Sequence, residues 1–155
     1  IARLGWHIVV YFEAPDLDDL IPFLKQLPTT IVVDHMGRPD VTKGVDHPDF
    51  QRFVAFMDDN DTVWTKVSCP ERLTVAGPPY DDVTAHARLL VERFPDRVLW
   101  GTDWPHPNMK SHMPDDGALV DYVPKIAPTA ELQQKLLVDN PMRLYWSTHD
   151  ETGPD

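Results

Sequence analysis

RVLWGTDWPHPN (residues 97–108) joins a short apolar run to a rigid turn that carries a carboxylate. The first half of the stretch is typical of a buried β-strand, and a glycine and two prolines end that strand. Asp103 therefore stands where the strand ends, next to Trp104 and close to His106. A charged side chain is not expected at the end of a strand in an ordinary hydrophobic core. The stretch therefore predicts a strand that ends in a catalytic pocket.

Three further runs of the sequence have the same apolar, β-branched or aromatic character. They are WHIVVYF (6–12), TTIVVDH (29–35) and TVWTKVS (62–68). Segments with apolar residues at helical spacing lie between these runs and after the last one, at 16–27, 47–60, 80–94 and 129–146. Strands that read as continuous apolar runs are usually buried on both faces, and their alternation with helices indicates a parallel α/β sheet.

Two parallel architectures fit this alternation: an open doubly wound sheet and a (β/α)8 barrel. A dinucleotide-binding open sheet carries a G-x-G-x-x-G turn after its first strand, and no such turn occurs in the sequence. Each of the four runs instead ends in polar or aromatic side chains, which in a barrel all open into one pocket. Four strands make half of a TIM-type barrel that normally takes about 250 residues. We therefore expect an α/β chain that forms half of such a barrel.

The 155-residue chain carries a formal net charge of −11. This acidic balance argues against a nucleic acid or an anionic membrane as partner, because both need a basic surface. Hydrophobic residues make up 42% of the chain, enough for a packed core, and no apolar stretch approaches the length of a membrane span. Cys69 is the only cysteine, so no internal disulfide can form and we expect a reducing, cytoplasmic setting.

Asp103 and His35 are the residues that we expect to carry the chemistry. The carboxylate of Asp103 suits a general base that takes a proton from an attacking water, or a metal ligand; the structural alternative is a turn or capping aspartate. His35 precedes a tight turn at Gly37 and Pro39, which predicts an imidazole at the mouth of the pocket. It suits polarisation of a carbonyl group or metal binding. Neighbouring Asp34 is expected on the opposite side of the strand.

Three further side chains are candidates for binding a small anionic substrate. Arg72, just beyond the third run, suits bidentate capture of a carboxylate, although most loop arginines are solvated. Tyr11 ends the first run, where it either donates to an anionic oxygen or simply packs. Asn108 can offer its amide to a carboxylate, and nearby His106 either lines the pocket or stabilises the loop.

A metal site made only from this chain would have few ligands. Its candidates are His35, Asp103 and, third, His106, which is sparse for a zinc site that needs three protein ligands. Cys69 lacks a partner at a spacing typical of reactive cysteines, so we expect it to pack. The sequence also has no nucleophile elbow, no P-loop and no H-E-x-x-H motif. These residues therefore give no signature of a bound cofactor and only a sparse set of metal ligands.

Three motifs together resemble a known family. They are VVDHMGRPD (32–40), WTKVSCPERL (64–73) and LWGTDWPHPN (99–108), in this order. In them the chain is similar to the amidohydrolase superfamily of (β/α)8 barrels, and within it to the lactonases that hydrolyse 2-pyrone-4,6-dicarboxylate. The similarity covers only the C-terminal half of the family's barrel, and the family's His-x-His pair does not occur here. The similarity runs from about Trp6 to Trp146, so we expect residues 1–146 to form this half. The polar, acidic composition of residues 147–155 predicts a flexible tail.

The resemblance also implies a reaction. A cyclic ester from the breakdown of lignin-derived aromatics, 2-pyrone-4,6-dicarboxylate, would open reversibly to 4-oxalomesaconate without a divalent metal. Asp103 matches the family's general base, and His35 matches the histidine that polarises the lactone carbonyl. Tyr11, Arg72 and Asn108 match positions that contact the substrate and its carboxylates.

Two other interpretations remain open. Metal-dependent members of the same superfamily include decarboxylases of aromatic acids and sugar lactonases. The chain also fits a piece that is inactive alone and completes a barrel with an N-terminal half, either missing or on a separate chain. A half barrel would leave two unpaired sheet edges and an exposed apolar face, which favours pairing with that partner.

Overall fold

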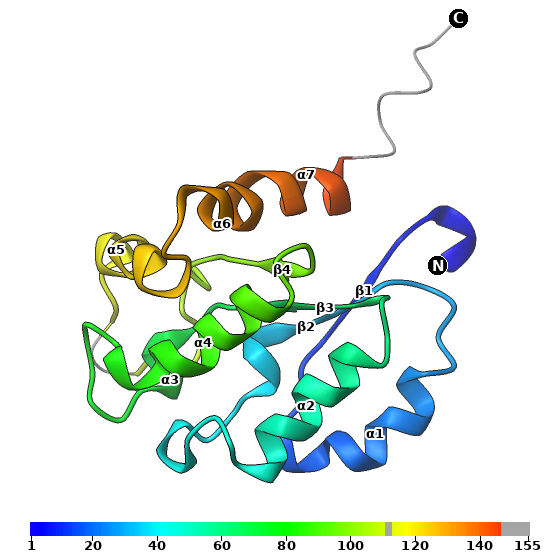
Figure 1. Cartoon of the computed structure of the whole chain (residues 1–155), viewed down its shortest axis with the longest axis horizontal. Coiled ribbons are helices and arrows are strands. Elements are labelled where there is room, and N and C mark those ends of the chain that lie inside the picture. Colours follow the sequence, from blue (N-terminus) through cyan, green and yellow to red (C-terminus); the bar gives the residue numbers. More distant parts are fainter. Residues whose placement is uncertain (111–112, 147–155) are drawn as a thin grey trace, which may run out of the picture.

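Four short parallel strands form the centre of the structure, a computed structural model that describes residues 1–110 and 113–146. The strands are β1 (Ile8–Val10), β2 (Ile31–Val33), β3 (Val63–Lys66) and β4 (Val98–Leu99). They lie in the order β1-β2-β3-β4, so each strand pairs with its neighbours in the sequence (Figure 1). All four predicted runs are confirmed as strands. Each strand is shorter than its run, because the flanking residues of the run belong to the connecting turns.

Helices follow the strands as the spacing of apolar residues predicts. The expected segments contain α1 (Leu17–Leu24), α2 (Pro48–Asp58), α4 (Asp81–Arg93), and α6 (Ala130–Gln134), which a π-helical turn (Lys135–Asp139) joins to α7 (Asn140–Tyr145). Thr129 caps α6 as expected, since its hydroxyl accepts a hydrogen bond from the Leu132 amide at 3.2 Å. The structure adds two helices that the sequence analysis did not predict, α3 (Pro70–Leu73) and α5 (Asp116–Ile126). The first is a single turn, and the second contains Pro124 near its C-terminal end.

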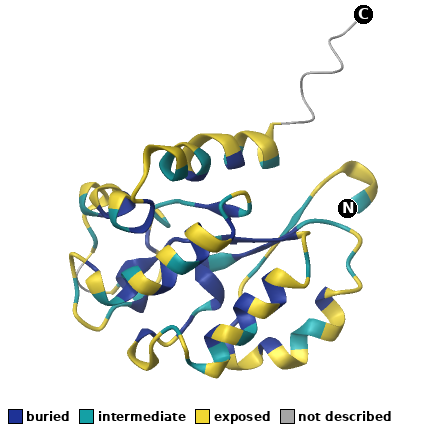
Figure 2. Ribbon diagram, in the orientation of Figure 1, coloured by how far each residue is buried: buried dark blue, intermediate teal, exposed yellow. Residues whose placement is uncertain are grey.

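The main core lies between one face of the sheet and helices α1, α2 and α4 (Figure 1). Ile31, Val63 and Val98 on this face are at most 2% exposed, and they pack in one cluster with Phe53 of α2 and Leu90 of α4. Figure 2 shows the buried residues gathered on the sheet and on the helix faces that meet it. Full burial of such a side chain contributes about 1.5–3 kcal/mol. This packing fixes the strands and so the positions of their carboxyl ends.

The opposite face of the sheet carries Val32, Trp64 and Leu99, all buried. Helix α7 lies on this side of the sheet (Figure 1), and its Leu144 packs against these three residues. The Arg143 guanidinium lies 4.8 Å from the centroid of the Trp64 ring, a cation–π contact. Helix α7 therefore covers Val32, Trp64 and Leu99, which form part of the apolar face that we expected to be exposed.

The two outer strands are open edges. In the described part of the chain, β1 pairs only with β2 and β4 pairs only with β3. Val9 of β1 is 46% exposed, unlike its paired neighbour Val32. The unpaired edges expected of a half barrel are therefore present.

Within residues 1–110 and 113–146, none of the helices combines the length and the apolar character that crossing a bilayer requires. The acidic tail predicted at 147–155 lies outside the described residues.

Candidate active site

All five residues singled out from the sequence line one cavity of about 510 Å³ at the carboxyl ends of the strands. They are Tyr11 after β1, His35 after β2, Arg72 after β3, and Asp103 and Asn108 after β4. Glu13, Asp34, Arg38 and Pro107 complete the lining. A parallel sheet gathers the residues that follow its strands at one edge, which explains how positions almost 100 residues apart share a cavity.

The backbone turns sharply where three of the strands end. His35, Cys69 and Asp103 have φ values of 53°, 66° and 64°, in the left-handed region that disfavours residues with a Cβ atom. Such strain costs about 1–3 kcal/mol per residue and collects at functional sites. The turn after β2 also needs Gly37, because a Cβ atom there would lie 3.2 Å from ring atoms of Phe12 and Phe53. These turns aim the three side chains toward one another.

His35 and Asp103 form the centre of the cavity. The Nε2 atom of His35 lies 3.6 Å from Oδ1 of Asp103, and the two side chains are 9% and 20% exposed. Burial lowers the pKa of His35, against the opposing effect of the Asp103 carboxylate. The imidazole is therefore neutral at pH 7. Its Nδ1 atom lies 2.9 Å from the Ser68 hydroxyl, within hydrogen-bond distance.

Two further groups contact the second carboxylate oxygen of Asp103. The Cys69 thiol donates to Oδ2 at 3.4 Å, and a guanidinium nitrogen of Arg72 lies 3.7 Å from the same atom. Burial raises the pKa of the Cys69 thiol well above its ordinary range, so it remains a neutral donor. Cys69 is fully buried, as expected of a packing residue, but it also touches the candidate base. No sequence pattern indicated this contact, because it depends on the left-handed turn at Cys69.

His35, Cys69 and Asp103 place one ligand atom each within 4.8 Å of one another, the spacing of a metal site. His106, which the sequence suggested as a third ligand, does not belong to this group in the described part of the chain. Two features of this group oppose cation binding. The Arg72 guanidinium already lies beside the Asp103 carboxylate, and the thiol would have to lose a proton that its burial retains.

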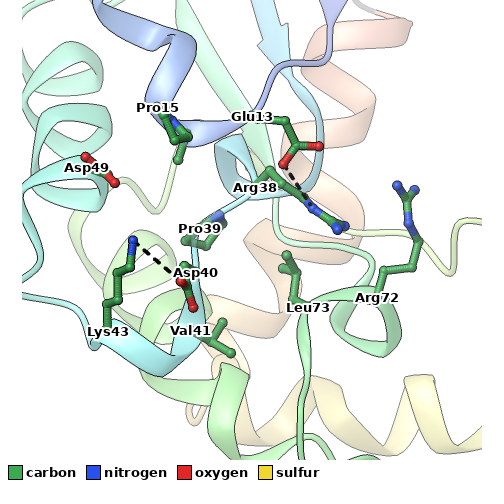
Figure 3. A pocket seen from close by; sticks show the side chains of 11 residues that line it. Glu13, Pro15, Arg38, Pro39, Asp40, Val41, Lys43, Asp49, Arg72 and Leu73 are labelled. Atoms are coloured by element: carbon green, nitrogen blue, oxygen red, sulfur yellow. Dashed lines mark ion pairs between the residues drawn. The ribbon is translucent and has the colours of Figure 1, made fainter.

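A second arginine, Arg38, faces the cavity and was missed by the sequence analysis. Its Nε atom lies 3.5 Å from Oε2 of Glu13, and the Tyr11 hydroxyl donates to the same carboxylate. Figure 3 shows this ion pair in an adjoining cavity, which Arg72 also lines. Arg38 follows His35 by three residues in the turn that already pointed to a pocket, and this spacing is the signal that could have revealed it. The Arg72 guanidinium carbon lies 6.0 Å from the Tyr11 ring centroid.

Asp34 does not point away from the cavity as expected. It lines the cavity beside His35, and its carboxylate lies 2.7 Å from Nζ of Lys66 on β3. The alternation of sides along a strand ends with β2 at Val33, and the left-handed turn at His35 brings that side chain back to the same cavity. The expectation for Asp34 was therefore wrong.

His106 stabilises the loop and is not among the residues that line the 510 Å³ cavity. Its buried ring lies between two carboxylates, with Nδ1 3.5 Å from Glu71 and Nε2 3.2 Å from Asp116. Its backbone amide donates to the Asp103 carbonyl at 2.7 Å. Burial raises the pKa of Glu71. His106 thus ties α3 and the start of α5 to the turn that holds Asp103.

Comparison with known proteins decides the family. The family model described as amidohydrolase matches residues 1–146. The chain belongs to the amidohydrolase family. The resemblance seen in its three motifs is therefore confirmed.

Relatives of this amidohydrolase chain include proteins that act on lactones. It is 68% identical to 2-pyrone-4,6-dicarboxylate hydrolase of Comamonas testosteroni, over 94% of this chain and 50% of that protein. It is 40% identical to 4-sulfomuconolactone hydrolase of Hydrogenophaga intermedia, over 92% of this chain and 48% of that protein. A solved structure from Acinetobacter baumannii, named for 2-pyrone-4,6-dicarboxylic acid hydrolysis and containing citric acid, superposes with a TM-score of 0.78. That match has 28% identity over 92% of this chain and 53% of the other.

The amidohydrolase chain spans about half the length of the curated relatives it matches. The solved structures show the same proportion, since the chain superposes on about half of each. Its four-stranded parallel sheet is therefore half of a barrel, as the strand count predicted.

Proposed function

We propose that this chain supplies one half of a lactonase that hydrolyses 2-pyrone-4,6-dicarboxylate to 4-oxalomesaconate, reversibly. The observation that carries the proposal is the pair formed by His35 and Asp103, 3.6 Å apart in the cavity that also holds Arg38 and Arg72. The 68% identity to a hydrolase of this dicarboxylate supports the substrate class. So does the citric acid in the Acinetobacter baumannii relative, since citrate is also a polycarboxylate.

Asp103 acts as the general base in this proposal. Its carboxylate takes a proton from water while the water oxygen bonds to the lactone carbonyl carbon. The ring C–O bond then breaks, and the ring oxygen leaves as an enolate that accepts the proton held by Asp103. The Nε2–H group of His35 donates to the carbonyl oxygen as negative charge develops there. The Ser68 hydroxyl positions His35 by holding its other ring nitrogen.

The two substrate carboxylates need cationic partners. Arg72 and Arg38 both line the cavity, so each carboxylate has one guanidinium available to it. Tyr11 and Asn108 line the same cavity and supply a hydroxyl and an amide as neutral donors. The sequence had suggested a single arginine for this task, and Arg38 supplies the second.

The proposed reaction uses no metal and no cofactor from this chain. The Arg72 guanidinium beside Asp103 supplies the positive charge that a metal would otherwise provide. We also propose a cytoplasmic location, as expected from the single cysteine, and a role in the breakdown of lignin-derived aromatics. Residues 1–146 serve as one folded unit in it, and an N-terminal half barrel is the partner that completes the site.

Hydrolysis by a completed barrel tests the proposal. This chain can be co-expressed with the N-terminal half of the Comamonas testosteroni relative, giving a complex that we call the reconstituted barrel. Loss of the pyrone absorbance reports ring opening. We expect the reconstituted barrel to consume 2-pyrone-4,6-dicarboxylate, before and after dialysis against a strong chelator, and this chain alone to be inactive. A folded one-to-one complex that leaves the lactone intact would refute the proposal, and activity lost to the chelator would refute its metal independence.

A further inference from the structure

We propose that Glu13 is an internal competitor of the substrate, whose carboxylate occupies the place that one substrate carboxylate takes on binding. The inference rests on the proposed function, because it concerns the same cavity. It adds a residue that neither the sequence motifs nor the proposed reaction requires. Glu13 follows Tyr11 by two residues, in the turn between β1 and α1.

Glu13 engages two of the groups that face the substrate cavity. The Tyr11 hydroxyl donates to Oε1 of Glu13, and Nε of Arg38 lies 3.5 Å from Oε2. One carboxylate thus holds a phenol and a guanidinium together, which is the donor set that a substrate carboxylate would use. The hydrogen bond to Glu13 is the main cause that raises the pKa of Tyr11, so the phenol stays protonated as a donor.

The contacts of Glu13 are of a kind that a ligand can replace. Its side chain is 54% exposed, and that of Arg38 is 27% exposed. An ion pair of such exposure is weak, because water screens the charges and two long side chains must be ordered. When Arg72 holds one carboxylate of the substrate, the other carboxylate is present near Arg38 at a high effective concentration. It therefore competes with Glu13 for Arg38.

The fold also leaves room for the displaced side chain. Glu13, Arg38 and Arg72 line both the 510 Å³ cavity and a second cavity of about 330 Å³. Figure 3 shows this second cavity, where Lys43 pairs with Asp40 at 3.6 Å and Asp49 also belongs to the lining. The Glu13 carboxylate can turn into it without entering an apolar environment. Glu13 then lowers affinity for every anion at Arg38, and a ligand with two carboxylates overcomes it better than a ligand with one.

Substitution of Glu13 by Gln removes the charge while it keeps the shape of the side chain, and Glu13→Ala removes both contacts. Asp18→Asn is the matched control, since it removes one negative charge from a 62% exposed carboxylate that pairs with Arg52 instead. Citrate affinity is measured by calorimetry on the reconstituted barrel at low salt, and KM is measured for 2-pyrone-4,6-dicarboxylate. We expect Glu13→Gln and Glu13→Ala to bind citrate about three- to fivefold more tightly and to lower KM by a similar factor. Asp18→Asn should match the unmodified protein.

The direction of the change in citrate affinity tests whether Glu13 competes with the substrate. Unchanged or weaker citrate binding in both Glu13 variants would overturn it, because Glu13 would then merely position Tyr11 and Arg38. An equal gain in Asp18→Asn would also overturn it, since the effect would come from net charge alone. If the unmodified barrel binds citrate but leaves the lactone intact, the proposed function fails, and the ratio of citrate affinities still tests the role of Glu13.

Discussion

His35, Cys69 and Asp103 each adopt a left-handed backbone in the turn that follows a strand, and these three turns explain which site residues the sequence could reveal. A polar residue at the end of an apolar run is visible in the sequence, so Asp103 and His35 could be predicted. Beyond the strand the alternation of sides no longer applies. For that reason Asp34 was placed on the wrong side, and Arg38 was overlooked.

Arg72 is the residue whose substitution should damage substrate recognition most selectively. Arg72→Met in the reconstituted barrel should lower kcat/KM for the pyrone dicarboxylate about 10- to 100-fold, since a charge-assisted hydrogen bond contributes about 1.5–3 kcal/mol. Steady-state kinetics measure this loss, with Arg88→Met as the control because Arg88 is an exposed residue that pairs with Glu92 on α4. Equal kinetics in the two variants would mean that Arg72 does not bind a carboxylate.

At the scale of elements, the sequence predicted the strands and most of the helices from their apolar periods. It missed α3 and α5, which connect the ends of β3 and β4 to the outer layer. Helix α3 is a single turn without a period of its own, whereas α5 buries Leu119, Tyr122, Val123 and Ile126 at helical spacing, a signal that was overlooked. What the sequence could not show is the contact of His106, whose ring lies between Glu71 of α3 and Asp116 of α5. No local sequence pattern indicates this contact, because Glu71 and Asp116 are 35 and 10 positions away from His106.

Removal of the His106 ring should loosen this corner of the fold. His106→Ala should lower the free energy of unfolding by about 1–3 kcal/mol, because Glu71 loses its buried partner. Urea denaturation of this chain measures the change, and His7→Ala, at a half-buried position, serves as the comparison. Equal destabilisation by the two variants would contradict the linking role of His106.

The packing of α4 on α2 should make stability depend on pH. His86 of α4 is 1% exposed and stacks edge-on against Phe50 of α2, with ring centroids 4.7 Å apart. Burial lowers the pKa of His86 from its ordinary value of 6.5. Below that pH, His86 binds a proton in the unfolded chain but not in the folded chain. The free energy of unfolding therefore falls as the solution is acidified.

The stability of His86→Leu should therefore depend less on pH. Each proton bound only by the unfolded chain changes the slope by at most about 1.4 kcal/mol per pH unit. We expect urea denaturation between pH 7.5 and 5 to show a shallower decline for His86→Leu than for the unmodified chain. Identical slopes would show that His86 does not titrate on unfolding.

The whole molecule is half of an amidohydrolase barrel, with two open strand edges and a last helix that covers one face of the sheet. Strand count predicted the half barrel, because a barrel of this type needs eight strands. The position of α7 could not be read from the sequence, since it depends on which surface of the sheet is free. The candidate site lies entirely at the carboxyl ends of β1 to β4, so a second half barrel can complete it without rearranging the contacts among His35, Ser68 and Asp103.

The most direct measurement is the turnover of 2-pyrone-4,6-dicarboxylate by the reconstituted barrel when Asp103 is replaced by Asn. The substitution keeps the size of the side chain and removes the base beside His35. We expect kcat to fall about 10²- to 10⁴-fold, while the complex still forms and still binds citrate. Turnover near the unmodified rate would show that the carboxylate at position 103 takes no proton from water, and the mechanism built on it would be wrong.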